Sequence, residues 1–479
     1  MFDLGGPVVS ELLEWAQASD RSRAARRARV TQLLEPYLPW LRHLPVVKIA
    51  GTNGKGSVCA MLSAALRRDG RRPALFTSPH LVRVTERFRV DDREVDADTL
   101  DAHAARVLAF ARELVRRRGE AWRPSFFEAL LGTALDLFRD AGVDVLVCEA
   151  GVGGAHDATS LLPGDLGAVT TLSLDHQDVL GDTLEAIAAD KAGIVGPGAH
   201  LVLGPRIPPE LLALVAAHAP GVTLSRARTD SLRAVLHGAA PTSVEVDLEG
   251  DGRGPAALQR SHRRPSTGAQ GRTVDTSDAP HTGGTLRLSL PLLGPHQIDN
   301  FATVLELARQ LVARGVLRDL RSLAGIEATL WPGRLELRAG PPRVLLDAAH
   351  NVEGLQALAR ALDHLAPHAA RLLAFGMSSG KDATACAALV PHIAPAVVLV
   401  EGFHRARPVS ELRALLPAGS SCRGAFATPR ALVDFVTQDA GAGLHGATLV
   451  AAGSIFMVGD VERGLDRACA TTLYADAPR

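Results

Sequence analysis

Short apolar runs alternate with amphipathic stretches over the first half of the chain. Residues 45–50, 143–148 and 168–174 are apolar enough for buried strands, and each run leads into polar or glycine-rich sequence. Between them, residues 57–68 have apolar side chains at helical spacing, with Val58, Met61, Leu62 and Leu66 on one face. Strands that alternate with helices predict a mostly parallel α/β sheet.

Two segments depart from this alternation. The first 45 residues are rich in arginine and have apolar positions at helical spacing, which predicts amphipathic helices. Residues 242–248 and 285–290 alternate apolar and polar positions, which predicts the partner strands of a hairpin. Between these strands, residues 249–284 are rich in Gly, Ser, Arg and Pro, which predicts a disordered insertion without a core or a catalytic part.

A second α/β series follows residue 295. Its expected strands are residues 343–346, 371–375, 396–400 and 448–451, separated by helical stretches. This half is of ordinary domain size. We therefore expect one domain over residues 1–295 and a smaller, Rossmann-like α/β domain over residues 296–479.

Composition narrows the classes of function. The 479 residues, 47% of them hydrophobic, suffice for two or three domains with real cores. The chain has equal numbers of basic and acidic residues, 52 of each. This balance argues against a protein that binds nucleic acid or membranes through a strong electrostatic field of one sign. We find no membrane-spanning run and no secretory signal, and the five cysteines are scattered, so a cytoplasmic protein is expected.

Lysine is rare in this chain. Only Lys48, Lys55, Lys191 and Lys381 stand among the 52 basic residues, and all the others are arginine. Where arginine is the default cation, a retained lysine suggests that its amine chemistry is needed.

A glycine-rich loop, residues 51–57, joins the first apolar strand to the following helix. Its glycines let backbone N–H groups approach phosphates, and the helix N-terminus adds partial positive charge. Lys55 can reach the β- and γ-phosphates of a nucleotide, and the Ser57 hydroxyl can bind Mg²⁺. Gly56 separates Lys55 from Ser57, unlike the common P-loop. The alternative is a connecting glycine turn, but the context favours a P-loop-type ATP-binding domain.

Polar residues at the ends of the next strands suggest a metal site. Glu149 follows the strand 143–148, where a carboxylate is well placed to hold Mg²⁺. His176 ends the following strand, although a lone histidine is more often structural. Lys191 lies on a helix that begins at the capping-box sequence 182–185. A neutral lysine amine near the metals could capture CO₂ as a carbamate, which arginine could not do.

Several long motifs together resemble one family. The loop G-T-N-G-K-G-S resembles the ATP-dependent Mur ligase superfamily and, within it, folylpolyglutamate synthase and dihydrofolate synthase. The resemblance runs in order from about residue 46 to Ser454. The motifs that carry it, besides the loop, are residues 77–81, 125–128, 157–159, 173–176, 180–183, 190–194, 294–297, Asn300, 331–334 and 347–351.

This resemblance implies roles for particular residues. The ATP-binding residues are Gly51, Thr52, Asn53, Gly54, Lys55, Gly56, Ser57, Asn300, Arg334 and Asp347. The Mg²⁺ ligands are Ser57, Ser78, Glu149 and His176, with Lys191 as a carbamylated ligand of a second ion. The pterin-binding residues are Ser125, Phe126, Phe127, Glu128, Asp157, Ala158 and Thr159. The glutamate-binding residues are His350 and Ser454, and the residues closest to the chemistry are Lys55, His176, Lys191 and Arg334.

Three positions depart from the family pattern. Ala155 stands where the family usually has arginine, Ser160 where it has asparagine, and Ser125 where it has threonine. The last change keeps a hydroxyl. Loss of the arginine at position 155 bears on substrate preference rather than on ATP chemistry.

The resemblance implies an ATP-dependent ligase that joins L-glutamate to a pterin carboxylate through an acyl phosphate. The acceptor would be dihydropteroate, a tetrahydrofolate or both, and Asp157 favours a bifunctional dihydrofolate synthase/folylpolyglutamate synthase. ATP, L-glutamate and two Mg²⁺ ions complete the expected ligands, with no nucleic acid or membrane partner and a monomeric state. The alternatives are folylpolyglutamate synthase alone, a related ligase acting on a peptidoglycan precursor, or a non-catalytic nucleotide-binding paralogue.

Overall fold

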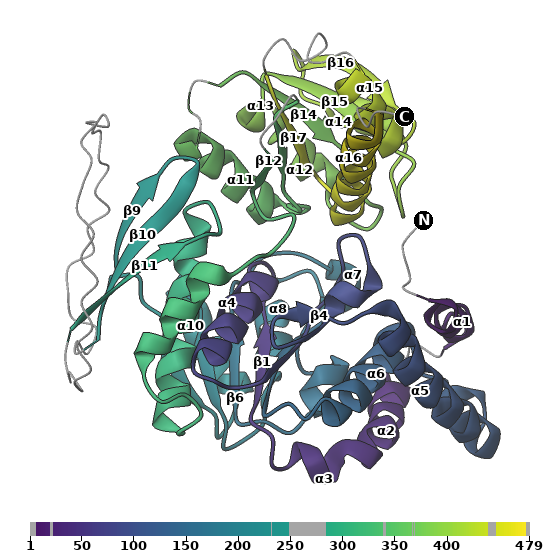
Figure 1. Cartoon of the computed structure of the whole chain (residues 1–479), viewed down its shortest axis with the longest axis vertical. Coiled ribbons are helices and arrows are strands. Elements are labelled where there is room, and N and C mark those ends of the chain that lie inside the picture. The colour runs from purple at the N-terminus through teal and green to yellow at the C-terminus, as the bar shows by residue number, and fades with distance from the viewer. Residues whose placement is uncertain are drawn as a thin grey trace.

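The protein is described here from a computed structural model. It describes residues 6–19, 23–230, 232–248, 284–338, 342–365, 367, 369–438 and 447–475. Two α/β domains lie one above the other, with a small three-stranded sheet beside them (Figure 1). The two-domain α/β prediction is therefore confirmed, whereas the insertion predicted at residues 249–284 lies almost entirely outside the described residues.

The sheet of the first domain has the strand order β4-β3-β2-β5-β1-β6-β7-β8. Strand β1 (Val46–Ala50) lies at its centre, parallel to both neighbours, β5 (Val145–Glu149) and β6 (Leu166–Val169). The other strands are β2 (Pro73–Phe76), β3 (Phe88–Val90), β4 (Arg93–Glu94), β7 (His200–Leu203) and β8 (Thr223–Arg226). Antiparallel pairing joins β2 to β3 and β3 to β4, at one edge of this sheet. The mostly parallel sheet was predicted correctly.

Helices cover both faces of this sheet (Figure 1). The helices before residue 295 are α1 (Pro7–Ala16), α2 (Arg23–Leu34), α3 (Leu38–Leu41), α4 (Lys55–Arg68), α5 (Ala97–Arg118), α6 (Phe126–Asp140), α7 (Gln177–Leu180), α8 (Leu184–Ala192) and α9 (Pro209–His218). On one face, α4 packs with Val47 and Ile49 of β1. On the other, α1, α2, α5 and α6 form a second core, which explains the apolar spacing of the arginine-rich N-terminal segment.

Helix α10 (His296–Ala313) and the 3₁₀ segment η5 (Leu320–Ala328) also belong to the first core. Phe301, Leu305 and Leu323 are buried together with residues of β1 and α4. The segment that follows, residues 329–335, leads directly into the second sheet. We therefore propose a domain boundary in this linker rather than at residue 295.

The predicted hairpin is present. Strand β10 (Ala240–Asp247) pairs antiparallel with β11 (Thr285–Leu290), bringing Val244 opposite Leu288. A third strand, β9 (Leu232–His237), adds to the other edge of β10 and was missed in the sequence because it alternates only partly. Figure 1 shows this sheet at the side of α10.

The second domain is built on the strand order β12-β13-β17-β14-β15-β16. Four strands were predicted: β13 (Val344–Leu346), β14 (Arg371–Phe375), β15 (Ala396–Val400) and β17 (Thr448–Ala452). The short edge strands β12 (Glu336–Arg338) and β16 (Ser421–Phe426) were not. The helices are α11 (Val352–Leu365), α12 (Ala383–Ala387), α13 (Val390–Ile393), α14 (Val409–Leu415), α15 (Pro429–Gln438) and α16 (Ile455–Ala475). All strand pairs except β12–β13 are parallel.

Two local predictions were wrong. The strand expected to reach residue 174 ends at Val169. Beyond it, the hydroxyl of Thr170 donates to the carbonyl of Asn53 at 2.5 Å, and that of Thr171 accepts from the Asn53 N–H at 3.0 Å. The side chains of these threonines therefore support the glycine loop. The helix that carries Lys191 is capped by Thr183, whose hydroxyl accepts from the Ala186 N–H, and not by Asp182.

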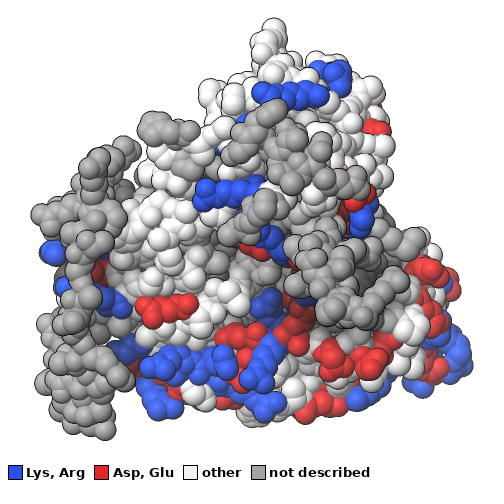
Figure 2. All heavy atoms as spheres, turned by 45° about the horizontal axis from the view of Figure 1, so that its top comes forward, with Lys and Arg blue, Asp and Glu red and all other residues white. Residues whose placement is uncertain are grey.

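The surface matches the balanced composition of the chain. On the face drawn in Figure 2, basic and acidic side chains are interspersed over the lower part of the molecule. Within the described residues, no helix is both long and apolar enough to cross a membrane.

Candidate functional site

The glycine loop follows the central strand β1, at the point where the strand order continues to β5 on one side and β6 on the other. Such a switch point is where open α/β sheets bind their ligands. Gly54, with φ of 85°, leaves no room for a side chain, because a Cβ there would lie 2.3 Å from Oδ1 of Asn300. Loop and α10 are therefore in close contact, as expected if Gly54 and Asn300 act on the same ligand.

The unusual position of Gly56 has a physical cause. A Cβ at Gly56 would lie 2.7 Å from Nε1 of Trp331, which reaches the start of α4 from the interdomain linker. The guanidinium of Arg89 lies over the Trp331 ring, with its carbon 5.0 Å from the ring centroid. The glycine between Lys55 and Ser57 thus admits the linker that joins the two domains.

A cavity of about 150 Å³ opens above the loop. Its lining includes Thr52, Asn53, Gly54, Lys55, Gly56, Ser57, Asn300, Arg334 and Asp347, all predicted as ATP-binding. Gly51 does not line it. Lys55 lies folded onto the loop, with Nζ 3.1 Å from the carbonyl oxygens of both Gly51 and Thr52. Phosphates in this cavity would compete with these carbonyls for the ammonium.

Ser78 and Glu149 lie at the edge of this cavity. The Ser78 N–H donates to Oε2 of Glu149 at 3.1 Å, while the buried Ser78 hydroxyl has no hydrogen-bond partner among the described residues. Burial raises the pKa of Glu149, and the nearby Lys55 offsets part of this effect. A buried carboxylate next to an unsatisfied hydroxyl is a set of oxygen donors that fits a hard divalent cation.

His176 lies in a separate polar group together with Asp175, His350 and Lys381. Burial, followed by repulsion from Lys381, lowers the pKa of His176 to about 4, so the imidazole is neutral and able to act as a ligand. Lys381 binds Oδ1 of Asp175 at 2.5 Å, and Nε2 of His350 lies 3.6 Å from Oδ2 of the same carboxylate. Asp175 therefore ties the second domain to the segment between β6 and α7 that carries His176.

Lys191 is buried beneath the loop. Its Nζ donates to the carbonyl of Gly51 at 3.0 Å. Burial, with a smaller contribution from Lys55, lowers the pKa of Lys191 to about 7. A large fraction of this amine is therefore neutral at neutral pH, the state that reacts with CO₂.

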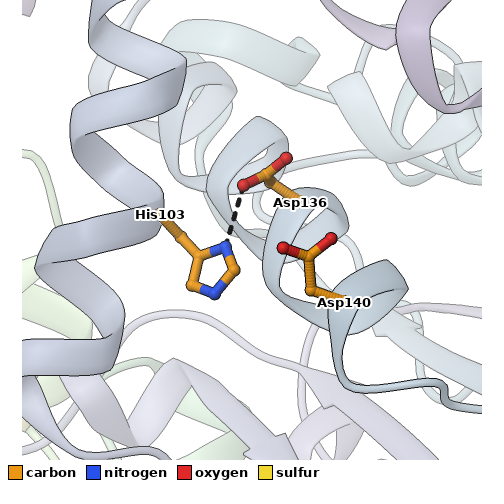
Figure 3. A group of neighbouring side chains, drawn as sticks. All are labelled: His103, Asp136 and Asp140. Atoms are coloured by element: carbon orange, nitrogen blue, oxygen red, sulfur yellow. Dashed lines mark hydrogen bonds and ion pairs between the residues drawn. The ribbon is translucent and has the colours of Figure 1, made fainter.

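Figure 3 shows a different group of potential ligands. Among the described residues, His103, Asp136 and Asp140 are the His and carboxylate side chains whose ligand atoms all lie within 4.8 Å of one another. Arg106 lies 3.1 Å from Asp136 and 2.6 Å from Asp140, and Arg139 donates to Asp136 at 2.9 Å. These arginines neutralise both carboxylates, so we interpret the group as an ion-pair network joining α5 to α6.

A larger cavity, of about 440 Å³, adjoins the first. It is lined by five residues predicted as pterin-binding, Ser125, Phe127, Glu128, Asp157 and Ala158, and by the predicted ligands Ser78, His176, His350 and Ser454. Phe126 and Thr159 do not line it. Phe126 packs against the core formed by the N-terminal helices, and the Thr159 hydroxyl donates to Asp157 at 2.7 Å.

The two acidic residues of this cavity have their oxygens engaged by the protein. Arg29 binds both oxygens of Glu128, at 2.7 and 2.9 Å, and the Ser125 N–H donates to Glu128 as part of a capping box. Asp157 accepts from the N–H groups of Gly151 and Val152, each at 3.0 Å. Both carboxylates thus shape the cavity wall.

The chain is similar to known proteins in sequence and in structure. The Mur ligase glutamate ligase domain matches residues 333–455. The dihydrofolate synthase/folylpolyglutamate synthase of Mycobacterium tuberculosis is 31% identical over 407 residues, which cover 80% of this chain and 76% of that protein. The chain belongs to the folylpolyglutamate synthase/dihydrofolate synthase family. The Escherichia coli relative of the same name is 31% identical over 338 residues, which cover 70% of this chain and 68% of that protein.

Solved structures agree with this assignment. The Mycobacterium tuberculosis folylpolyglutamate synthase complexed with ADP has a TM-score of 0.78 at 26% identity, covering 99% of this chain and 100% of that one. The Escherichia coli protein in complex with DHPP and ADP has a TM-score of 0.70 at 26% identity, covering 98% and 99%. A "probable bifunctional folylpolyglutamate synthase/dihydropteroate synthase" of Haloferax volcanii is 35% identical, but this chain spans only 38% of its length.

The family motifs do not include every residue that builds the site. Glu353, at the start of α11, accepts from Asn53 at 2.6 Å and from Ser173 at 2.8 Å, and Asn351 donates to Oδ1 of Asn53 at 3.1 Å. The second domain therefore holds the asparagine of the ATP loop. The charge and position of Glu353 gave no signal in the sequence, because its partners lie far away along the chain.

Lys48, for which the sequence suggested no role, holds in place a loop next to the larger cavity. Lys48 belongs to β1, and its buried ammonium donates to the carbonyls of Leu162 at 3.0 Å and Ser160 at 3.4 Å. Burial lowers the pKa of Lys48 to about 8. These carbonyls directly follow the family motif Asp157-Ala158-Thr159, so Lys48 fixes the loop that carries it.

We expect Lys48→Met to raise the KM for the pterin acceptor about fivefold to tenfold while leaving the KM for ATP within about twofold, because the two lost hydrogen bonds support only the acceptor loop. Methionine keeps the length of the side chain and removes its charge. Steady-state kinetics with each substrate varied, together with thermal melting, checks this. Equal increases in both KM values would show that Lys48 acts on the whole fold instead.

Proposed function

We propose that this chain joins L-glutamate to the carboxylate of a pterin acceptor with hydrolysis of ATP, acting as a bifunctional dihydrofolate synthase/folylpolyglutamate synthase. One observation carries the proposal: the cavity above the ATP loop and the larger cavity share Ser78, Pro79, His350 and Ile455 in their linings. A phosphate and an acceptor carboxylate could therefore meet at this junction. The related structures whose titles name ADP, and DHPP with ADP, support the same pairing of ligands.

The residues at the junction fit Mg²⁺. We propose Ser57, Ser78 and Glu149 for one ion, on the unsatisfied Ser78 hydroxyl and the buried Glu149 carboxylate, and His176 with a carbamate on Lys191 for a second. Carbamylation would replace an ammonium by an oxygen donor and agrees with the buried, partly neutral amine of Lys191. Bound Mg²⁺ would offset charge on the phosphates.

The chemistry requires activation, because a carboxylate and an amine do not condense in water. The acceptor carboxylate would attack the γ-phosphorus of ATP, forming a C–O–P linkage and releasing ADP. The α-amine of L-glutamate would then attack the acyl carbon, forming the amide and expelling phosphate with one oxygen of the original carboxylate. Lys55 and Arg334 would stabilise the transferring phosphoryl group, and His350 and Ser454 would hold the glutamate.

We propose a monomer that works in the cytoplasm, in agreement with the free cysteines Cys59, Cys148, Cys386 and Cys422. Closure of the two domains around ATP would exclude water from the acyl phosphate. The direct contacts of Asn53 with Asn351 and Glu353 support such coupling between loop and second domain.

The test is ADP release by the purified protein with ATP, Mg²⁺ and L-glutamate, and with either dihydropteroate or tetrahydrofolate as acceptor. Bifunctionality predicts glutamate-dependent turnover with both acceptors. Turnover with tetrahydrofolate alone would reduce the function to folylpolyglutamate synthase. Turnover with neither acceptor would refute the assignment and leave the non-catalytic nucleotide-binding alternative.

A further inference from the structure

The larger cavity contains one basic side chain whose charge the protein leaves uncompensated. Among the described residues, three long basic side chains line it: Arg26, Lys381 and Arg405. Lys381 pairs with Asp175, and the guanidinium of Arg26 lies 3.6 Å from the Glu128 carboxylate and donates to the His156 carbonyl at 2.8 Å. Within the described part of the chain, no carboxylate lies within 4.0 Å of the Arg405 guanidinium.

The backbone around Arg405 is fixed in a definite conformation. Its φ of 57° lies in the left-handed region, which is unusual for a side chain other than glycine. The Arg405 carbonyl accepts from the Ser379 N–H at 2.7 Å, and a β-bridge pairs Ser378 with Ala406. The exposed side chain therefore projects from a loop anchored to the cavity wall.

The cavity has two chemically different ends. The first domain contributes the apolar side chains of Phe127, Val152 and Leu180, a surface suited to an aromatic ring system. The second domain contributes Arg405 together with Ser378 and Ser454, whose hydroxyl oxygens lie 2.8 Å apart. A ligand that fills both ends would need an aromatic part and an anionic part.

We propose that Arg405 binds a carboxylate of a glutamyl group at the second-domain end of this cavity. The inference rests on the proposed function and specifies a subsite of it. The carboxylate has two sources, the glutamyl tail of an acceptor folate or the incoming L-glutamate. The Arg405 guanidinium donates to the Ser379 carbonyl at 3.5 Å but pairs with no carboxylate among the described residues, so it gains a charge-assisted, bidentate hydrogen bond when such a carboxylate arrives. Dihydropteroate has no carboxylate besides the one that reacts.

The test compares acceptors in the wild type, Arg405→Gln and Arg405→Lys. The acceptors are dihydropteroate, tetrahydrofolate and tetrahydrofolate diglutamate, and the KM for L-glutamate is measured with dihydropteroate as acceptor. Arg413→Gln is the matched control, since Arg413 is an exposed arginine of α14 and does not line the cavity. Equilibrium binding of tetrahydrofolate diglutamate to each variant is measured alongside.

For a tail subsite, we expect Arg405→Gln to raise the KM for the glutamylated acceptors at least about tenfold, and that for dihydropteroate by less than about threefold. For a subsite of the incoming amino acid, the KM for L-glutamate rises instead. Arg405→Lys restores part of either loss because it keeps the charge. Unchanged KM values, or equal increases for every substrate including ATP, overturn the inference.

The binding measurement separates this inference from the proposed function. If the wild type ligates no glutamate but loses diglutamate affinity upon Arg405→Gln, the function fails and the carboxylate subsite stands. If the wild type is active and Arg405→Gln changes neither kinetics nor binding, the function stands and the subsite fails.

Discussion

Replacement of Lys191 by alanine is expected to lower kcat at least about 10³-fold while changing the affinity for ADP by less than about threefold. The lysine lies under the ATP loop rather than in the cavity lining, and its ammonium contacts the loop through the Gly51 carbonyl. Nucleotide binding should therefore survive its loss. Turnover should not, because the carbamate would supply an oxygen ligand that alanine lacks. The measurement is steady-state turnover combined with ADP titration.

Two controls make this result specific. Lys191→Arg keeps a positive charge but forms no carbamate, so we expect the same loss of turnover as with alanine. Bicarbonate added to CO₂-depleted wild type should restore activity, and it should have no effect on either variant. Near-normal activity of Lys191→Ala, or no response of the wild type to bicarbonate, would contradict the carbamate.

Glu149→Gln is the second change with a large expected effect. Glutamine keeps an oxygen that can accept the Ser78 N–H, so the local fold should be retained while the negative charge is lost. We expect kcat to fall about 10²- to 10³-fold and the Mg²⁺ concentration for half-maximal activity to rise, because an amide oxygen is a weaker ligand than a carboxylate. A Mg²⁺ titration of turnover measures both quantities.

Glu210→Gln is a suitable control for the loss of one negative charge, since Glu210 is an exposed residue of α9 in the same domain. It should leave both the rate and the Mg²⁺ dependence unchanged. An unaltered Mg²⁺ dependence of Glu149→Gln would remove Glu149 from the metal site and leave it as a structural partner of Ser78.

The central part of the fold was predictable because its residues follow strong local patterns. Strand β1 is buried on both faces and continues into a glycine loop and an apolar helix, so residues 45–68 were identified almost to the residue. The strand prediction failed at residues whose side chains bind another segment of the chain. Thr170 and Thr171 prolong an apolar run in the sequence, but in the structure they hold Asn53 of the glycine loop.

The sequence predicted only those site residues that belong to a recognisable motif. Glu128 was expected at the pterin site and lines the larger cavity, but its pairing with Arg29 of α2, across 99 positions, is one that no local pattern reveals. Glu353 and Arg405 escaped notice for the same reason, since their importance comes from what the second domain places beside them. Lys48 drew attention by its rarity, but only the fold showed which carbonyls it holds.

The fate of the acceptor oxygen tests the proposed acyl phosphate most directly. The acceptor carboxylate is labelled with the heavy oxygen isotope, and the products formed with ATP, Mg²⁺ and L-glutamate are examined by mass spectrometry. We predict one labelled oxygen in each molecule of released phosphate and one new glutamyl amide for each ADP. Unlabelled phosphate, or ADP formed without a glutamyl amide, would contradict ligation through an acyl phosphate.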